Sequence, residues 1–286
     1  MNPDFDRLRR REALYMGAGA AIAGLTGLAG SAVNATTSSN GQSMPAELNK
    51  SISFLRRKPG TTREQFNAKW LSEHGPGARD IPGIEGFVVG EVVDDPAAGA
   101  SRAVAAPSLD GITESWQAPG IDRAAQARQY PHVREWLGAA PTYIGAIKIV
   151  VTREHVMVPP IRGGNKVMTL IYRKPEQTHD QFVEYMLKVH GPLSREVPGL
   201  RGYVLSEIIR SPAMQGLPGI PELGEPDMIG QSWMSPDPAD HTPDSPERKA
   251  WLADGAANFG SFFRYLMKEH EFVTPPYGRK TKGGAA

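Results

Sequence analysis

The sequence contains no cysteine. This absence excludes disulfide bonds, thiolate zinc sites, iron–sulfur clusters and a cysteine nucleophile. The glycine-rich and serine motifs of dinucleotide-binding, nucleotide-binding and serine-hydrolase proteins are also missing. Beyond its first residues the chain has no run of basic residues, so we expect no nucleic-acid partner.

What remains is the composition of an ordinary folded protein. The 286 residues are 40% hydrophobic and 22% charged, with a mean hydropathy of −0.37 and a formal net charge of +1. Glycine and proline are frequent, with 31 and 25 residues, which indicates many loops. The length is sufficient for one large domain or two small ones.

Residues 1–35 have the three-part pattern of an export signal. Basic residues around Arg10-Arg11 precede a mildly apolar run at 13–30, and Val33-Asn34-Ala35 has the small residues of a cleavage site. The arginine pair resembles the twin-arginine (Tat) motif. We therefore expect the Tat export machinery as a partner and a periplasmic or secreted protein.

A stable membrane anchor is the alternative that this segment favours less. The apolar run is short and interrupted by glycine, whereas a spanning helix needs about 20 apolar residues. Residues 36–50, rich in Thr, Ser, Asn and Gly, predict a flexible linker. Removal of residues 1–35 takes four of the 32 basic and three of the 31 acidic residues, which leaves the two signs balanced.

The rest of the sequence repeats itself at a distance of about 116 positions. Arg57-Lys58-Pro59 recurs as Arg173-Lys174-Pro175, and His74-Gly75-Pro76 recurs as His190-Gly191-Pro192. Further matched pairs, with the spacing drifting by one residue, are Thr62/Thr178, Gln65/Gln181, Phe66/Phe182, Gly86/Gly202, Glu91/Glu207, Trp116/Trp233, Trp136/Trp251, Glu154/Glu269 and His155/His270.

We interpret this pattern as a tandem duplication, with repeats at 51–160 and 166–276. The hinge between them is Gly163-Gly164-Asn165, and residues 277–286 form a tail. Tyr203 has Phe87 at the matched position, so the repeats are not chemically equal and at most one pocket is expected to be active.

Each repeat predicts the same order of elements. The first strands are expected at 51–57 and 167–173, and capping boxes at Thr62 and Thr178 open the helices that follow. Gly75-Pro76 and Gly191-Pro192 are expected to end those helices. The remaining elements are strands from Gly86 and Gly202, strands through Trp116 and Trp233, helices carrying Trp136 and Trp251, and last strands near 146–156 and 262–273.

The order β-α-β-β-α-β, found twice, predicts an α+β fold built from two ferredoxin-like units. In such a unit, two helices cover one face of an antiparallel sheet, and the other face must be buried by something else. Two copies in one chain can cover each other, sheet to sheet. We therefore expect an internal pseudo-dimer.

These motifs resemble those of the EthD family in both halves. The shared pattern is a strand ending in Arg-Lys-Pro, a Thr-x-x-x-Phe helix, His-Gly-Pro, Pro-Gly, and a last strand with Glu-His. The resemblance implies an intramolecular dimeric α+β barrel, with oxidoreductase as the leading class of activity. Members of the family are often single-domain and not exported, and this chain departs from that pattern on both points. Related barrels include cofactor-free monooxygenases, cyclases, lactone isomerases and haem-binding peroxidases.

His74 and His190 are the candidate catalytic residues. Each lies at the end of its predicted helix, immediately before Gly-Pro. A histidine, with a pKa of about 6.5, suits general acid/base chemistry or a hydrogen bond to a substrate near neutral pH. A histidine at a helix C-terminus also complements the helix dipole and the free carbonyl groups there. Both interpretations stay open: a catalytic role, or residues that only mark the fold.

Trp116, Trp233, His155 and His270 are the candidate residues of a substrate pocket. The two tryptophans occupy matched strand positions, where they either contact an aromatic molecule or fill the core. His155 and His270 follow a glutamate on the last strands, and alternation lets only one residue of each Glu-His pair face a given side. Their structural alternative is a hydrogen bond to a loop carbonyl.

No metal site is predicted, because the histidines lack His-x-x-x-His and His-x-His spacing. No cofactor is evident; a haem site needs only one axial ligand, often histidine, and stays an open alternative without support. Glu91 and Glu207, matched near the ends of the second strands, are interpreted as solvated charges rather than bases in a cavity.

The sequence thus predicts an exported EthD-like barrel that acts on a small apolar or aromatic molecule with histidine acid/base help. A non-catalytic binding or carrier barrel with the same cavity is the alternative, and a role in assembly alone is the third. A homodimer of the whole chain is a further expectation.

Overall fold

The computed structural model describes residues 48–93, 106–161 and 166–278. The predicted export signal, the hinge at 163–165, and most of the linker and the tail lie outside these ranges, so they stay predictions. None of the described helices combines the length and apolar character that crossing a membrane requires.

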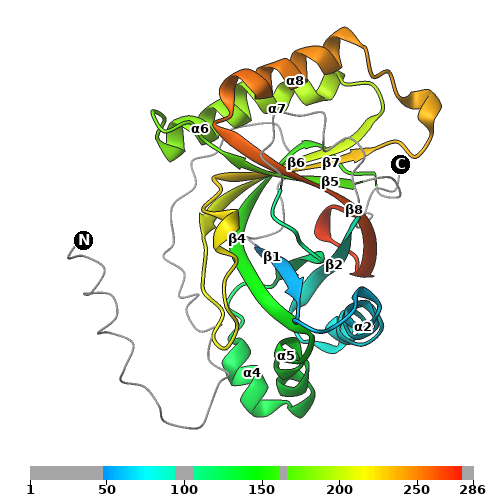
Figure 1. The fold of residues 1–286 in the computed structure, drawn as a ribbon, viewed down its shortest axis with the longest axis vertical. Coiled ribbons are helices and arrows are strands. Elements are labelled where there is room, and N and C mark those ends of the chain that lie inside the picture. Colours follow the sequence, from blue (N-terminus) through cyan, green and yellow to red (C-terminus); the bar gives the residue numbers. More distant parts are fainter. Residues whose placement is uncertain (1–47, 94–105, 162–165, 279–286) are drawn as a thin grey trace, which may run out of the picture.

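Eight antiparallel strands close into one barrel (Figure 1). Around the barrel the strands follow the order β1, β3, β2, β8, β5, β7, β6 and β4, and β4 pairs with β1 again. Their bounds are β1 Asn49–Arg57, β2 Ile84–Val93, β3 Gly111–Gln117, β4 Ile144–Val158, β5 Lys166–Tyr172, β6 Leu200–Arg210, β7 Met228–Met234 and β8 Ser261–Val273.

The helices gather on two opposite sides of the barrel, one set for each half of the chain (Figure 1). In the first half they are α2 Arg63–Lys69, the π-helix η1 Trp70–His74, α3 Gly75–Gly77, the 3-10 turn η2 Ala78–Asp80, α4 Arg123–Gln129 and α5 Pro131–Tyr143. In the second half they are α6 His179–Tyr185, the π-helix η4 Met186–His190, α7 Gly191–Leu193, the 3-10 turn η5 Ser194–Glu196 and α8 Pro246–Asn258. The described residues also include short 3-10 turns at η6 Pro221–Leu223, η7 Pro238–Asp240 and η8 Pro276–Gly278.

The predicted α+β fold is confirmed: strand, helix, two strands, helix and strand follow one another in each half. The two sheets join along their edges, where β2 pairs with β8 and β4 pairs with β6. The sheet faces that the helices leave uncovered therefore become the inside of one barrel. This closure is how the two halves bury each other's open faces.

Both predicted capping boxes are present. Thr62 accepts from the backbone N–H of Gln65 and Thr178 accepts from that of Gln181, and each glutamine side chain reaches back to the N-cap backbone. Each box starts a helix and satisfies two backbone groups that would otherwise lack partners.

The prediction that Gly75-Pro76 and Gly191-Pro192 end these helices is wrong. The chain continues in helical form through α3 and η2, and likewise through α7 and η5. A π-turn precedes each Gly-Pro, with the Gly75 N–H bonded to the Trp70 carbonyl five residues back. Each proline then falls in the first turn of a new short helix, where its missing N–H is tolerated.

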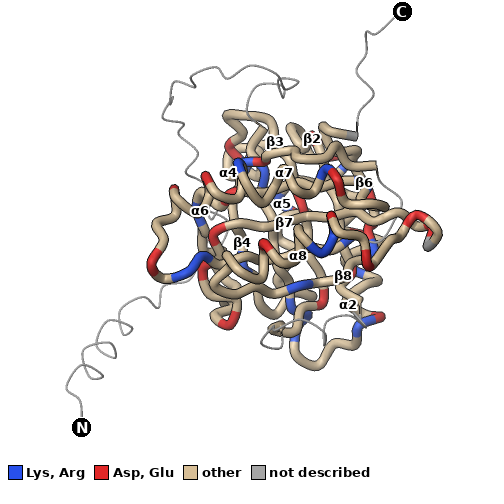
Figure 2. Tube along the Cα trace, turned by 90° about the horizontal axis from the view of Figure 1, so that it is seen from above, with Lys and Arg blue, Asp and Glu red and all other residues tan. Residues whose placement is uncertain are grey.

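The inside of the barrel is apolar in its middle and ionic at one end. Ile52, Phe54, Val150, Met168 and Leu170 belong to the apolar part, together with Ile112, Ile229 and Met267. In the view of Figure 2, basic and acidic residues are interspersed over the described chain.

The ionic end holds Lys50 and Lys166, both fully buried. Lys50 pairs with Glu114 and with Glu154, while Lys166 pairs with Glu114 and with Glu269. β1 begins at Asn49, inside the predicted linker 36–50, and this earlier start carries Lys50 into the barrel.

Candidate functional site

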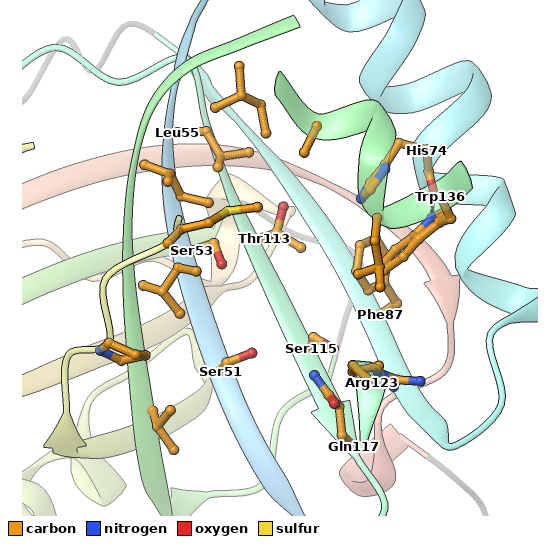
Figure 3. A pocket seen from close by; sticks show the side chains of 18 of the residues that line it. Ser51, Ser53, Leu55, His74, Phe87, Thr113, Ser115, Gln117, Arg123 and Trp136 are labelled. Atoms are coloured by element: carbon orange, nitrogen blue, oxygen red, sulfur yellow. Dashed lines mark hydrogen bonds between the residues drawn. The ribbon is translucent and has the colours of Figure 1, made fainter. Parts of the chain in front are cut away.

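A cavity of about 330 Å³ lies outside the barrel, between the sheet of the first half and its helices. Because side chains alternate along a strand, Ile52 and Phe54 point into the barrel while Ser51, Ser53 and Leu55 face the helices. Thr113 and Ser115 of β3 lie beside them, so small polar side chains form the floor (Figure 3). A side wall comes from the segment after β6, through Pro212, Ala213 and Met214.

The walls are mostly apolar and come from several elements. Trp136, Ala140 and Tyr143 of α5 stand over the floor, and Trp70 and His74 of the π-helix η1 close one side. Phe87, Ile147 and Ile149 complete the apolar surface. An apolar cavity with a few polar groups is typical of a binding site for a small molecule.

His74 lies in this cavity with an unpartnered nitrogen. Its ring stacks on Trp136 with 4.3 Å between centroids and 13° between planes, and the Trp136 Nε1 donates to the His74 carbonyl at 2.8 Å. The His74 Nδ1 is buried and has no hydrogen-bond partner among the described residues. Burial lowers the pKa of His74 to about 4, so the imidazole is neutral at pH 7.

The Tyr143 hydroxyl is a second unpartnered polar group on the same wall. Tyr143 is buried, its Oη has no partner among the described residues, and its ring lies edge-on to that of His74 at 5.9 Å. Burial raises the pKa of Tyr143, with the charge of Glu73 adding to the shift, so the phenol keeps its proton. A buried polar group without a partner is rare and calls for an explanation, such as a ligand.

His190, the matched histidine of the second half, lies in a filled site. Its Nδ1 is 2.8 Å from Asp254 Oδ2, and the Tyr185 hydroxyl donates to the same carboxylate. Trp251 stacks on His190, and the Phe259 ring packs against it with 4.9 Å between centroids. Burial lowers the pKa of His190, and Asp254 opposes that shift.

The two halves are therefore unequal, as the sequence predicted. At the positions of Asp254 and Phe259, the first half has Ala139 and Ile144 at the same spacing as the Trp136/Trp251 match. Ile144 lines the cavity, whereas the larger Phe259 occupies the corresponding region beside His190. Of the two candidate catalytic residues, only His74 lines the cavity.

The predicted pocket residues Trp116 and Trp233 lie inside the barrel and do not line the cavity. Both are fully buried, and their Nε1 atoms donate to Glu154 at 2.7 Å and to Glu269 at 2.8 Å. Each ring also packs against a buried lysine, Lys50 or Lys166. Strand alternation places these tryptophans on the side opposite to the floor of the cavity.

His155 and His270 also lie away from the cavity. His155 Nε2 is 3.0 Å from Glu207, and His270 Nε2 is 2.5 Å from Glu91. Each pair bridges a junction between the halves, β4 with β6 or β2 with β8. The prediction of solvated charges at Glu91 and Glu207 is wrong, because both side chains are mostly buried and bonded to these histidines.

Sequence reasoning missed Tyr143 and Arg123, which both line the cavity. Neither belongs to a repeated motif, so nothing in the sequence marked them. For metals the structure adds no candidate, since no group of three His, Asp or Glu in the described ranges is placed to hold an ion.

Comparison with protein families finds a match for part of the chain. The profile of the EthD domain matches residues 174–262. No curated protein sequence matches the chain.

Three solved structures are similar. An anthrone oxidase-like protein is 16% identical, with 79% of this chain and 93% of that chain covered and a TM-score of 0.48. A provisionally assigned monooxygenase from Lactobacillus acidophilus is 12% identical, with 80% and 97% covered and a TM-score of 0.46. Another, from Fusobacterium nucleatum, is 11% identical, with 78% and 91% covered and a TM-score of 0.48. The chain thus carries an EthD domain at residues 174–262, within the α+β barrel described above.

Proposed function

We propose that the protein is a small enzyme that acts on an apolar or aromatic molecule in the first-half cavity, with His74 as its acid/base group. One observation supports the proposal: His74 lines the cavity, and its buried Nδ1 has no hydrogen-bond partner among the described residues. A neutral imidazole can accept a proton or a hydrogen bond from a bound molecule. The match of residues 174–262 to the EthD domain agrees with the family resemblance, which implies oxidoreductase as the class.

Export remains part of the proposal and rests on the pattern of residues 1–35 alone. The twin-arginine route carries folded proteins, so the barrel would reach the periplasm, or the outside, already closed. The homodimer also stays an expectation.

A binding or carrier barrel is the second candidate, and the low pKa of His74 favours it. A base whose pKa lies near 4 takes up a proton weakly at neutral pH, which limits its use as a general base. A neutral His74 imidazole can still form a hydrogen bond with a bound molecule, so a low pKa does not impair a binding role. Binding and turnover must therefore be measured separately.

Binding is tested with 2-naphthol, followed by its fluorescence. Ser53→Phe places a ring on the cavity floor and is expected to abolish binding. Thr169→Phe is the matched control, because Thr169 is the counterpart of Ser53 on β5 and does not line the cavity. Equal binding by both variants would place the ligand elsewhere.

Turnover is tested with anthrone, which takes up one O₂ and gives anthraquinone and water. His74→Phe keeps the stack on Trp136 but removes both nitrogens, and loss of an acid/base group typically lowers turnover about 100-fold or more. His132→Phe, at an exposed histidine, is the control. Binding of 2-naphthol without turnover in the wild type would assign the carrier function. A Soret band in protein purified from its native source would instead assign haem.

A further inference from the structure

The end of the cavity away from His74 holds a buried guanidinium group. Arg123 is only 2% exposed and lies beside Ser115 and Gln117 (Figure 3). Its Nη1 donates to the Pro82 carbonyl and to Gln126 Oε1, each at 2.6 Å. Its Nη2 is buried and has no hydrogen-bond partner in the part of the chain that the structure describes.

This cation also lacks a carboxylate. No ion pair joins Arg123 to an acidic side chain of the described residues, and both of its Nη1 partners are neutral. Buried arginines are ordinarily paired, because an uncompensated charge in an apolar environment is strongly destabilising. Burial lowers the pKa of Arg123 to about 10, so the group still carries its charge at neutral pH.

The charges of the residues that line the cavity also favour an anionic ligand. Its lining includes Lys50, Arg123 and Arg210 but no aspartate or glutamate among the described residues. Lys50 is neutralised from inside the barrel by Glu114 and Glu154, and Arg210 is exposed. Among the three lining cations, Arg123 is therefore the one that is buried and has no acidic partner among the described residues, so its charge can bind an anionic ligand.

We propose that Arg123 forms an anion subsite, and that the natural ligand of the cavity is an aromatic carboxylate. The carboxylate accepts from Nη2, the ring lies along the apolar walls, and the far end of the molecule meets His74 and Tyr143. A charge-assisted bond to a buried guanidinium is among the strong hydrogen bonds of proteins. This inference rests on the proposed function only in taking the cavity as the binding site.

The bonds of Nη1 have a structural role that the test must separate from binding. The bond to the Pro82 carbonyl ties α4 to the turn at Pro82, and the bond to Gln126 lies within α4; together they account for one nitrogen of the guanidinium. A purely structural arginine would not distinguish an anionic ligand from a neutral one of the same shape. The first measurement therefore uses wild-type protein and two probes, 2-naphthoate and its neutral isostere 2-naphthamide, in calorimetric titrations.

We expect the wild type to bind 2-naphthoate about tenfold or more tightly than 2-naphthamide. In Arg123→Met this preference should disappear, while the affinity for 2-naphthamide changes less than about threefold. Gln126→Leu is the matched control: it removes a partner of Arg123 but keeps the charge, and the preference should survive. Arg210→Met should also keep most of it, because Arg210 is solvated.

The outcomes separate this inference from the proposed function. If the wild type binds both probes equally, the anion subsite is refuted while the cavity remains a binding site. If it binds neither of them nor 2-naphthol, the proposed function fails as well. Should Arg123→Met not fold, the wild-type comparison still decides, and Arg123→Gln supplies a second variant.

The claim that the far end of the ligand meets His74 is tested with 6-hydroxy-2-naphthoate. This probe carries a hydroxyl at the end opposite its carboxylate. His74→Phe should weaken this probe by a larger factor than it weakens 2-naphthoate, because only the hydroxylated probe can bond to the imidazole. An equal effect on both probes would show that the far end of the ligand does not reach His74.

Discussion

Two histidines in the same sequence motif have different surroundings, and their neighbours decide what each can do. His190 has Asp254 on its Nδ1, with the Tyr185 hydroxyl on the same carboxylate. His74 has Ala139 at the position that matches Asp254, and no described residue bonds to its Nδ1. The motif therefore marks one place in the fold, while the chemistry depends on residues outside it.

His74 should make stability depend on pH. Its pKa is lowered from 6.5 to about 4 in the folded protein, so between these values the unfolded chain binds more protons. Stability is then fully present above about pH 6.5 and is lost as the pH falls toward 4, by up to about 3 kcal/mol. Urea unfolding at pH 7 and pH 4 measures the loss, which His74→Gln should reduce. His132→Gln, at an exposed histidine, should leave it unchanged; a loss of equal size in His74→Gln would contradict the assignment.

Asp254→Ala should destabilise the second half. The substitution leaves the buried His190 nitrogen and the Tyr185 hydroxyl without their shared acceptor, which costs about 2–4 kcal/mol of unfolding free energy. Thermal unfolding monitored by circular dichroism measures the effect. Tyr185→Phe removes only one of the groups bonded to this carboxylate, which also binds His190 and Asn258, and should cost less than Asp254→Ala. A neutral Asp254→Ala would mean that water replaces the carboxylate.

At this scale the sequence predicted one of the cavity residues and missed the others. His74 was found because His-Gly-Pro occurs twice. Arg123 and Tyr143 have no such marker. Within the described ranges, Arg123 has no carboxylate partner and the Tyr143 hydroxyl has no hydrogen-bond partner, and these absences are what make the two residues candidates. A missing neighbour becomes visible only when residues from several elements are placed in space.

Among the elements, the helix that runs through His-Gly-Pro meets the last strand of the other half. A Cβ on Gly75 would overlap the ring of Phe272 on β8, and one on Gly191 would lie 2.8 Å from the sulfur of Met157 on β4. Arg79 Nε donates to the Phe272 carbonyl at 2.9 Å. The glycine of the motif is therefore explained by close packing between the halves.

Two glycine substitutions should have opposite effects. Gly75→Ala forces a methyl group against the Phe272 ring and should lower the unfolding free energy by about 1–3 kcal/mol. Gly138→Ala, inside α5, meets no atom within 4 Å and should raise it by about 0.5–1 kcal/mol. Urea denaturation of both variants checks the pair. Equal destabilisation would show that α5 does not tolerate a side chain at this position.

The starts of helices were more predictable than their ends. A capping box is local, since Thr62 and Gln65 satisfy each other within one turn. The helix end at Gly75-Pro76 was misjudged because a π-turn shifts the backbone pattern and lets the proline begin a new turn. A π-turn has no sequence signature comparable to a cap.

For the molecule as a whole, the ionic cluster inside the barrel joins the two halves. Glu114, on β3, binds Lys50 of its own half and Lys166 of the other. Ion pairing holds the pKa of Glu114 down to about 2 despite burial, which opposes this shift, and holds that of Lys50 above its usual value against the same desolvation. Breaking such a pair leaves a buried charge uncompensated.

Lys166→Met should therefore destabilise the barrel by about 3–5 kcal/mol. The double substitution Lys166→Met/Glu269→Gln removes one charge of each sign and should recover part of the loss. Lys268→Met, at a neighbouring exposed lysine, is the control and should change stability by less than about 0.5 kcal/mol. Equilibrium unfolding in urea measures all three. No recovery in the double variant would show that lost packing, rather than unbalanced charge, causes the effect.

The overall architecture was the most predictable level, because the repeat indicated that two similar sheets would cover each other. How they join was not predictable: the pairings of β2 with β8 and β4 with β6 depend on strand twist and edge geometry, which composition and spacing do not encode. The burial of Lys50 inside the barrel is likewise not predictable from the sequence, since a lysine after a polar segment is usually solvated.

The pairing of β2 with β8 also has a consequence for how the protein is made. His270 and Glu91, which bond across this junction, are 179 positions apart. During synthesis the strand β2 has no partner on that edge until almost the whole chain has left the ribosome. An unpaired edge strand invites pairing with other chains, and such distant pairings form slowly. The first half should therefore be most prone to aggregation after it has been synthesised and before β8 is available to pair with β2. A chaperone would be needed most during this interval.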